Sequence, residues 1–464
     1  MANYKTVNVI PREIFRAYDI RGVVDETFIP SNIYTIGFAI GSEVIARGRD
    51  TIVIGCDGRL SGPKLLAAME AGIIASGCNV VNIGEVTTPI LYYTAAIIVS
   101  KSGAILSGSH NPPNYNGIKI VIDGETLNGT EIQKLYQRIM TQNFNLGAGV
   151  IRKTDVIDDY IQCVANDVKL SRPLKVVVDC GNGVGGKVVP KLLRRLGCEV
   201  IELYCEVDGN FPHHHPDPAV PENLEDLVKM VKIQKADVGM AFDGDADRIG
   251  VVTEAGEIIA SDNLLMLFAI DFLFRYPGIT ILFDVKCTRH LPEQIIKHHG
   301  IPLMYKTGHS LIKTKMKEIG ALLAGEYSGH IFIKDRWFGF DDAVYVAARF
   351  LEMLASKAKS CSEIFAELPN SISTPELKIP MAESQKFQFM QRLVKQAKIL
   401  DGKHNMIDGL RIDYDDGFGL IRASNTTPHL IMRFEGDTKY ALERIQGIFK
   451  EQLLLLDPKL QLPF

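Results

Sequence analysis

The sequence has no long apolar run, no strong net charge and no paired cysteines. Its longest apolar stretch, LLMLFAIDFLF at residues 264–274, is interrupted by Asp271 and is too short to cross a bilayer. The net charge of −4 gives no reason to expect nucleic acid or a membrane as partner. The eight cysteines form no CxxC pair and no zinc-type cluster, which favours a reducing compartment. Since no apolar segment resembles a signal peptide, we expect a cytoplasmic protein.

The length of 464 residues exceeds what one hydrophobic core serves and predicts three or four domains. Three segments share the order strand, turn, helix, strand, at residues 51–84, 174–204 and 279–308, which indicates repeated α/β units. The last ninety or so residues instead predict a helix, a hairpin, a further strand and a final helix, as in an α+β unit. We expect domains at residues 1–155, 156–257, 258–369 and 370–464.

Each repeat is followed by a polar loop between two apolar runs. These loops are SGSHNP at 107–112, FDGDADR at 242–248 and GEYSGH at 325–330. Open α/β sheets bind ligands at the ends of their strands, so we expect the three loops to face ligands.

The second loop carries Asp243, Asp245 and Asp247. On extended backbone, alternate residues face the same side, so the three carboxylates should face one way. Their repulsion would raise their pKa values unless a cation lay among them, and oxygen ligands favour Mg²⁺. A solvated acidic turn is the alternative. An EF-hand is excluded because Arg248 stands where that loop needs glycine.

The first loop places Ser109 beside His110, which raises the question of a nucleophile. A hydrolase elbow needs glycine where Asn111 stands, and an adjacent histidine is not expected to reach the serine Oγ. A metal site together with an anion site favours phosphoryl transfer instead, with the serine carrying the phosphoryl group.

Two other loops offer ligands for a sugar phosphate. In GEYSGH, Glu326, Ser328 and His330 would share one side of an extended segment and could bind neighbouring sugar hydroxyls, although a plain polar turn fits as well. The IRASNTTPHLIMRF segment predicts an anion-binding hairpin loop. Its polar residues are Arg422, Ser424, Asn425, Thr426 and Thr427, with Arg433 on the return strand.

Two motifs favour structural interpretations. The run DCGNGVGGK at 179–187 contains GxGxxG and resembles a P-loop, but Val188 replaces the required hydroxyl, so we interpret it as a tight strand–helix turn. Dinucleotide binding, and with it a dehydrogenase, is the alternative. The FPHHHPDP tract at 211–218 is interpreted as a loop, because its prolines prevent three histidines from converging in helical register.

Taken together, the motifs resemble the α-D-phosphohexomutase superfamily, in particular bacterial phosphomannomutase/phosphoglucomutase, in order along the whole chain. Besides the loops above, the resemblance rests on FRAYDIRG (15–22), CDGRLSGP (56–63), KTGHS (306–310) and RWFGFDD (336–342). The departures from the familiar pattern are Cys56, Ser107, Ala246 and Tyr327, of which only Tyr327 lies in the sugar loop. The resemblance implies three similar α/β domains with mixed sheets and a TATA-box-binding-protein-like α+β domain around a central cleft.

The implied activity is reversible phosphoryl transfer between hexose 1-phosphate and hexose 6-phosphate, of mannose or glucose. It would use a phosphoserine enzyme and a 1,6-bisphosphate that is both intermediate and activator. The resemblance implies Mg²⁺ bound by Asp243, Asp245, Asp247 and Ser109, and a catalytic group of Ser109, Lys119, His330, Arg21 and Arg248, with Lys119 and His330 as acid/base candidates. The implied substrate-binding residues are Tyr18, Lys286, His309, Glu326, Ser328, His330, Arg422, Ser424, Asn425, Thr426 and Arg433.

The expected partners are sugar phosphates, with neither nucleic acid nor membrane. We expect a monomer, with a dimer as the alternative. Competing functions are phosphoglucosamine mutase and a non-catalytic sugar-phosphate-binding protein, which would keep the anion site without a reactive serine.

Overall fold

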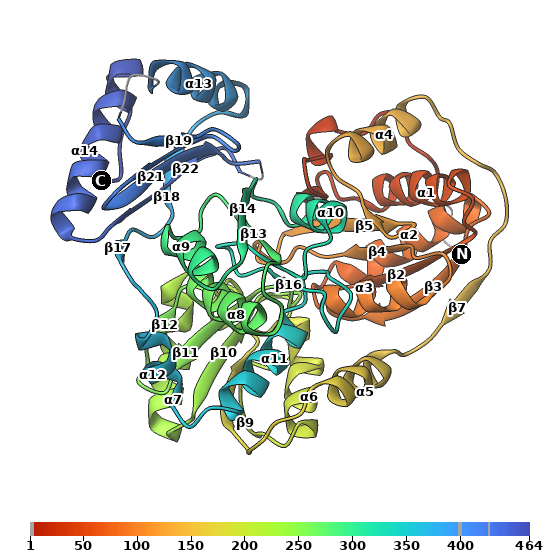
Figure 1. The fold of residues 1–464 in the computed structure, drawn as a ribbon. Helices are drawn as coiled ribbons and strands as arrows, with labels where there is room; N and C mark the ends of the chain where they lie inside the picture. Colours follow the sequence, from red (N-terminus) through yellow and green to blue (C-terminus); the bar gives the residue numbers. More distant parts are fainter. Residues whose placement is uncertain (1–3, 398–400, 426) are drawn as a thin grey trace.

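Four β-sheets follow one another along the chain in the computed structural model, which describes residues 4–397, 401–425 and 427–464 (Figure 1). The first sheet has the order β1-β5-β4-β2-β3-β7, with β6 beside β5. Its strands are β1 Ile20–Val23, β2 Thr51–Cys56, β3 Asn79–Glu85, β4 Gly103–Leu106, β5 Tyr115–Ile122, β6 Glu125–Thr126 and β7 Ile151–Lys153. Its helices are α1 Pro30–Ala46, α2 Gly62–Ala75, α3 Thr88–Ile97 and α4 Gly129–Met140, with a 3₁₀ turn η1 at Arg12–Ile14.

The second sheet has the order β12-β11-β10-β8-β9. Its strands are β8 Lys175–Asp179, β9 Glu199–Leu203, β10 Val238–Phe242, β11 Ile249–Thr253 and β12 Ile258–Ile259. The sheet therefore continues past residue 257. The helices are α5 Ile157–Asp167, α6 Val189–Arg195 and α7 Glu225–Gln234, with 3₁₀ turns η2 Val184–Lys187 and η3 Pro221–Leu224.

The third sheet has the order β14-β13-β15-β16. Its strands are β13 Thr280–Asp284, β14 Ile301–Tyr305, β15 Leu323–Gly325 and β16 Ile331–Ile333. The helices are α8 Ser261–Arg275, α9 His290–Lys297, α10 His309–Ile319, α11 Ala343–Ala355 and α12 Cys361–Ala366.

One pattern recurs in the first three domains and confirms the predicted repeat. In each, a strand, a helix and a second strand form a parallel pair: β2 with β3, β8 with β9, and β13 with β14. A third strand joins the first in parallel, and the chain then turns back antiparallel, through β4–β5, β10–β11 and β15–β16. The sheets are therefore mixed, as expected, and each polar loop is the turn at this reversal.

The C-terminal domain is an antiparallel sheet of order β17-β22-β21-β20-β19, with β18 also beside β22. Its strands are β17 Ile372–Ser373, β18 Leu377–Pro380, β19 Lys403–Asn405, β20 Leu410–Tyr414, β21 Gly417–Ala423 and β22 His429–Gly436. The helices α13 Glu383–Gln396 and α14 Lys439–Leu456 cover one face. Strand alternation sends Met432 and Phe434 into this helix-covered core and turns Arg433 and Glu435 toward the third domain.

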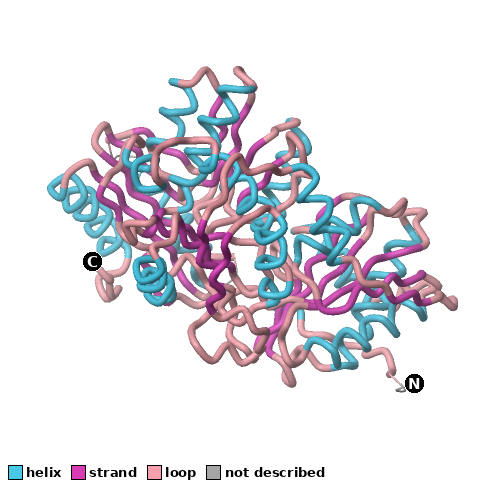
Figure 2. The backbone as a smooth tube through the Cα atoms, turned by 90° about the horizontal axis from the view of Figure 1, so that it is seen from below, coloured by secondary structure: helices cyan, strands magenta, loops and turns pink. Residues whose placement is uncertain are grey.

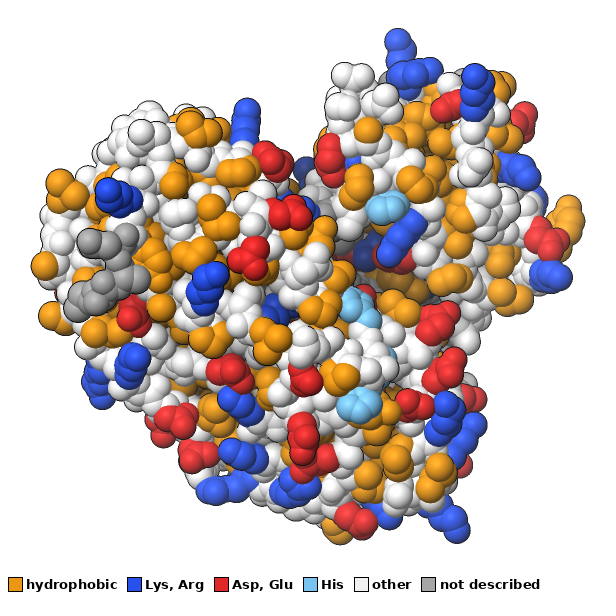
Figure 3. Space-filling model, turned by 180° about the vertical axis from the view of Figure 1, so that it is seen from behind, with side chains coloured by type: hydrophobic (Ala, Val, Ile, Leu, Met, Phe, Trp, Pro, Cys, Tyr) orange, Lys and Arg blue, Asp and Glu red, His pale blue; other side chains and the backbone are white. Residues whose placement is uncertain are grey.

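The four domains leave a hollow between the first domain and the C-terminal domain, with histidine side chains along its edge (Figure 3). The chain termini lie at opposite ends of the molecule (Figure 2). Among the described residues, no helix is both long and apolar enough to cross a membrane.

Candidate active site

Contacts between domains bring the polar loops together. Ser109 Oγ of the first domain donates to Asp243 Oδ2 of the second at 2.6 Å. Arg248 Nε of the second domain donates to His330 Nε2 of the third at 3.1 Å. In the C-terminal domain, the Asn425 amide donates to the hydroxyl of Tyr18, which belongs to the first domain. Because all four domains contribute, the site exists only in the assembled chain.

The aspartate loop is a tight turn, so the extended backbone expected for it is wrong. Ala246 has a left-handed φ of 57°, and the backbone N–H groups of Asp247 and Arg248 donate to Asp243 Oδ1 at 3.0 and 3.1 Å. The turn, not strand alternation, makes the carboxylates of Asp243, Asp245 and Asp247 converge, with oxygens within 4.8 Å of one another.

The three carboxylates differ in charge preference. Burial, reinforced by the other two carboxylates, raises the pKa of Asp243 well above its ordinary value, and burial with Asp245 also raises the pKa of Asp247. Burial opposes ionisation of Asp245 too, but the Lys119 ammonium outweighs it and lowers that pKa. Asp245 Oδ1 and Asp247 Oδ1 are buried and accept no hydrogen bond among the described residues. Three converging carboxylates, two of which keep an unpaired oxygen, suit a divalent cation.

Lys119 extends from β5 into this carboxylate group. Its Nζ lies 2.6 Å from Asp245 Oδ2 and also contacts Asp247 Oδ2. Burial would lower its pKa, yet the two carboxylates raise it well above the ordinary value. Lys119 is therefore protonated here, and an ammonium has no lone pair with which to accept a proton.

Ser109 is buried in a left-handed conformation with φ of 49°. This conformation brings His110 Nδ1 within 3.2 Å of Ser109 Oγ, so the expectation that His110 cannot reach the hydroxyl is wrong. The single hydroxyl proton, however, is donated to Asp243, so His110 Nδ1 can hydrogen-bond only as a donor. A donor cannot act as general base, and a Ser–His pair remains unsupported.

The third-domain loop is also a turn, so of the two interpretations of GEYSGH the extended segment is wrong and the turn is the one observed. Gly329 has φ of 98°, and the backbone of Glu326 and His330 is hydrogen-bonded across the turn. The buried Glu326 carboxylate accepts from the N–H of Gly308 at 2.5 Å, while Ser328 is half-buried. Burial, and then Asp284, raises the pKa of Glu326.

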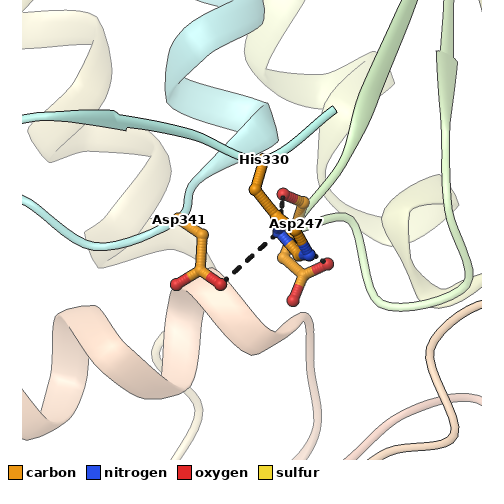
Figure 4. A group of neighbouring side chains, drawn as sticks. All are labelled: Asp247, His330 and Asp341. Carbon is orange, nitrogen blue, oxygen red and sulfur yellow. Dashed lines mark hydrogen bonds and ion pairs between the residues drawn. The ribbon is translucent and has the colours of Figure 1, made fainter. Parts of the chain in front are cut away.

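His330 lies between Asp247 and Asp341 (Figure 4). Since Arg248 donates to Nε2, the ring proton is on Nδ1, which faces the Asp247 carbonyl at 3.1 Å and Asp341 Oδ2 at 3.5 Å. Burial, then Arg248, lowers the pKa of His330 well below its ordinary value. His330 is therefore a neutral, oriented imidazole.

Asp341 also belongs to this group, although the sequence predicts no role for it beyond its place in the RWFGFDD motif. Its Oδ2 lies 3.3 Å from His309 Nδ1, and its Oδ1 accepts from Lys313 Nζ at 2.7 Å. No local sequence signal marks the residue, because its partners come from another helix and another loop.

The C-terminal loop holds part of the predicted anion site. Arg422 Nε donates to Asp408 at 2.9 Å, but its buried Nη2 has no partner among the described residues and can bind an anion. The hydroxyl of Ser424 accepts from Thr427 N–H and Oγ1–H at 3.1 and 2.9 Å. Asn425 lies beside them, and Thr426 lies outside the described residues.

The structure does not bring Arg433 into this loop. Its guanidinium pairs with Asp262 at 2.9 Å and lies 3.8 Å from the centroid of the Tyr327 ring, so it joins the C-terminal domain to the third domain. The expectation that it binds substrate phosphate is corrected accordingly.

The other expected cleft residues are buried and paired. Lys286 Nζ pairs with Glu376 at 2.7 Å, and Arg21 pairs with Asp19 at 2.5 Å. The Tyr18 hydroxyl donates to the Thr307 carbonyl at 2.6 Å.

The glycine-rich turn lies directly behind the aspartate loop. A Cβ on Gly183 would lie 2.8 Å from the Cα of Gly244, and Val184 N–H donates to the Gly244 carbonyl at 3.1 Å. The glycines therefore permit close backbone packing, which confirms the tight-turn interpretation. The histidine tract is a loop, as predicted, with His213 bonded to Asn182 and His214 to Asp179.

Comparison with known proteins covers the same four domains. Profiles described as phosphoglucomutase/phosphomannomutase match domain by domain: alpha/beta/alpha domain I at 12–146, domain II at 158–256, domain III at 260–372 and the C-terminal domain at 376–452. The chain is 54% identical over 455 residues to a phosphomannomutase/phosphoglucomutase of Pseudomonas putida, covering 98% of each. It is 50% identical over 446 residues to a phosphoglucomutase of Neisseria gonorrhoeae, covering 95% of this chain and 96% of that one. A crystal structure of a phosphoglucomutase/phosphomannomutase family protein from Burkholderia thailandensis superimposes with a TM-score of 0.93 at 48% identity, covering 98% and 100% of the two chains.

Proposed function

The chain belongs to the phosphoglucomutase/phosphomannomutase family, and from this premise we propose that Ser109 carries the phosphoryl group in a hexose phosphate mutase reaction. The protein is an enzyme of the isomerase class that interconverts hexose 1-phosphate and hexose 6-phosphate. Since the similar proteins are named for mannose and glucose, we propose these two sugars as substrates.

One observation carries the proposal for Ser109. Its Oγ is buried against Asp243, in the same group of carboxylates that Lys119 enters. A phosphoryl group on this oxygen would lie beside carboxylates that can bind a cation and that the Lys119 ammonium contacts, and phosphoryl transfer requires such positive charges nearby.

Each half-reaction exchanges one P–O bond for another. The bond between phosphorus and Ser109 Oγ breaks while a bond to the free sugar hydroxyl forms, and the proton of that hydroxyl must leave. The resulting 1,6-bisphosphate then reorients in the site so that its two phosphates exchange places, and its other phosphoryl group is transferred back to Ser109. His330 has a neutral ring close to the aspartate loop, and Lys119 is a charged hydrogen-bond donor. We propose that these two residues are the acid/base groups that transfer the proton of the sugar hydroxyl.

The aspartate group fits Mg²⁺. Asp243, Asp245 and Asp247 would hold it with an oxygen of phosphorylated Ser109, because their carboxylates converge inside a buried site and Asp245 and Asp247 each keep one oxygen without a hydrogen-bond partner among the described residues. When bound, Mg²⁺ would neutralise charge on the transferring phosphoryl group.

Substrate would be held at both ends. We propose that Glu326 and Ser328 bind sugar hydroxyls, and that Arg422 with Ser424 and Asn425 binds the phosphate that is not reacting. Since the bisphosphate reorients, either of its phosphates must fit the site formed by Arg422, Ser424 and Asn425. That site should therefore recognise phosphate rather than the rest of the sugar. The remaining proposed contacts are Tyr18, Arg21, Arg248, Lys286 and His309.

The site needs no second subunit, since all four domains come from one chain, and we propose a monomer. All eight cysteines are free thiols, which supports a cytoplasmic location.

A coupled assay tests the activity. Wild-type protein with Mg²⁺ and catalytic glucose 1,6-bisphosphate should convert glucose 1-phosphate and mannose 1-phosphate to their 6-phosphates. Ser109→Ala should lose at least about 1,000-fold in kcat while still binding sugar phosphate, because the acceptor for the phosphoryl group is gone. Full activity of Ser109→Ala would reject the mechanism, and activity on glucosamine phosphate alone would reject the proposed sugars.

A further inference from the structure

We propose that the side chain of Arg59 positions the Ser109 loop for phosphoryl transfer, together with Asp57 and Phe211. The proposal rests on the proposed function, since it takes Ser109 as the phosphoryl carrier. No role was expected for these residues from the sequence beyond the CDGRLSGP motif and the histidine tract in which they lie.

The guanidinium of Arg59 hydrogen-bonds to the backbone of the Ser109 loop at several points. It is 1% exposed and donates to four carbonyl oxygens of one short segment. Nη2 donates to Ser109 at 2.9 Å and to Asn111 at 2.5 Å, and Nη1 donates to Pro112 at 2.5 Å and to Tyr115 at 3.0 Å. A planar fork can hold several acceptors at fixed relative positions, which an ammonium cannot do.

Asp57 fixes the other side of the guanidinium. Its Oδ2 accepts from Arg59 Nε at 3.2 Å and from the backbone N–H of Gly108 at 2.9 Å. A Cβ on Gly108 would lie 2.2 Å from Arg59 Nε, so glycine is needed for this approach. Gly108, the residue before Ser109, is therefore also held by the Asp57–Arg59 ion pair.

Phe211 of the second domain packs its ring against the Arg59 guanidinium. The centre of its ring lies 5.2 Å from the guanidinium carbon of Arg59. The loop is thus held by contacts from two domains.

The consequence concerns the backbone of Ser109. A left-handed φ of 49° is unfavourable for a non-glycine residue, so neighbouring contacts must impose it. The Ser109 carbonyl is held by Arg59 and its N–H by Ser107 Oγ at 2.9 Å. Loss of the Arg59 guanidinium would free the Ser109 carbonyl and let Ser109 Oγ shift away from Asp243. A misplacement near 1 Å can cost about 100-fold in rate.

The test is the rate constant for phosphorylating Ser109 in a single turnover. Arg59→Lys and wild type are mixed with Mg²⁺ and glucose 1,6-bisphosphate, quenched, and measured by intact mass. A rate constant does not depend on the folded fraction, which changes only the amplitude. We expect a rate constant about 100-fold lower for Arg59→Lys, with the Kd for glucose 1-phosphate within about twofold of wild type. A rate constant within threefold of wild type would overturn the proposal.

Arg349→Lys is the matched control. Arg349 is also buried and hydrogen-bonded, to Asp335 in the third domain, but contacts no residue of the Ser109 loop. It should lose stability and keep the wild-type rate constant, and an equal loss in both variants would overturn the proposal.

Phe211→Leu provides a variant without altered hydrogen bonds or charge. It should lower the rate constant several-fold if the ring positions Arg59, and an unchanged value would remove Phe211 from the proposal. If Arg59→Lys does not fold, Asp57→Asn decides the case: a wild-type rate constant in that variant would overturn the proposal. Failure of wild type itself to become phosphorylated would instead reject the proposed function.

Discussion

Several buried ionisable side chains lie between Ser109 and His330, and neighbouring charged groups shift their pKa values. Asp243 and Asp245 stand in one loop, yet the pKa of one is raised and that of the other lowered, because Lys119 contacts only the second. His309 and His330 are both held near the neutral form. Such charge assignments could not be predicted from the sequence, since they depend on distances between loops of different domains.

Replacement of His309 should change how stability depends on pH. Burial, and then the Lys313 ammonium, lowers the pKa of His309 from 6.5 to about 4. Between these values the unfolded chain binds a proton that the folded chain excludes, so the free energy of unfolding rises as pH increases from 4 to 6.5. In His309→Asn this rise should be smaller by up to on the order of 3 kcal/mol, measured by urea denaturation at several pH values. The exposed His299→Asn serves as control. Equal slopes for His309→Asn and wild type would contradict the assignment.

At the scale of elements, the same reversal from parallel to antiparallel strands presents the loop of each α/β domain. The three repeats could be predicted because a strand, turn, helix and strand are each coded by nearby residues. The polar loops and their residue types could be predicted for the same reason.

The shape of those loops could not be predicted. Alternation along a strand suggested extended segments at Asp243 and Glu326, but both are turns, with φ above zero at Ala246 and Gly329. Likewise the reach of His110 follows from the φ of Ser109, and the pairing of Arg433 follows from where the third domain lies. Non-local packing decided each of these, and a single sequence carries little signal for it.

The packing of the glycine-rich turn on the aspartate loop gives a prediction at this scale. In Gly183→Ala, the new Cβ would lie 2.8 Å from backbone atoms of Gly244, which cannot yield without moving the aspartate loop. Overpacking of this kind costs about 1–3 kcal/mol of unfolding free energy, and we expect a higher Mg²⁺ concentration for half-maximal activity.

Gly447→Ala is the control, because its Cβ would meet nothing within 4 Å in helix α14 and should stabilise by about 0.5–1 kcal/mol. Wild-type stability together with wild-type Mg²⁺ dependence in Gly183→Ala would contradict the packing argument.

At the scale of the whole molecule, one tyrosine connects three domains. The hydroxyl of Tyr18 donates to the Thr307 carbonyl of the third domain and accepts from Asn425 of the C-terminal domain. The C-terminal domain is also fixed to the third domain by Arg433 and Asp262. Tyr18 thus joins the first domain to the opposite side of the hollow, where substrate is expected.

Tyr18→Phe should favour a more open molecule. Two hydrogen bonds of about 1 kcal/mol each are lost, and this sum of about 2 kcal/mol corresponds to a rise in KM of up to roughly 30-fold. Small-angle scattering should show a larger radius of gyration without ligand, and the difference should disappear with saturating sugar phosphate. Tyr440→Phe, at an exposed position on α14, should behave as wild type. Identical scattering and KM for Tyr18→Phe and wild type would show that the contact does not control opening.

Phosphoryl transfer through Ser109 can be tested by following the phosphoryl group on the protein itself. Protein treated with glucose 1,6-bisphosphate and Mg²⁺ is freed of ligand, mapped by peptide mass spectrometry, and then given excess glucose 6-phosphate or mannose 6-phosphate. We expect one phosphoryl group on Ser109, which is transferred to sugar in the second step. Turnover without phosphorylated Ser109, or with a phosphoryl group that stays on the protein, would contradict it.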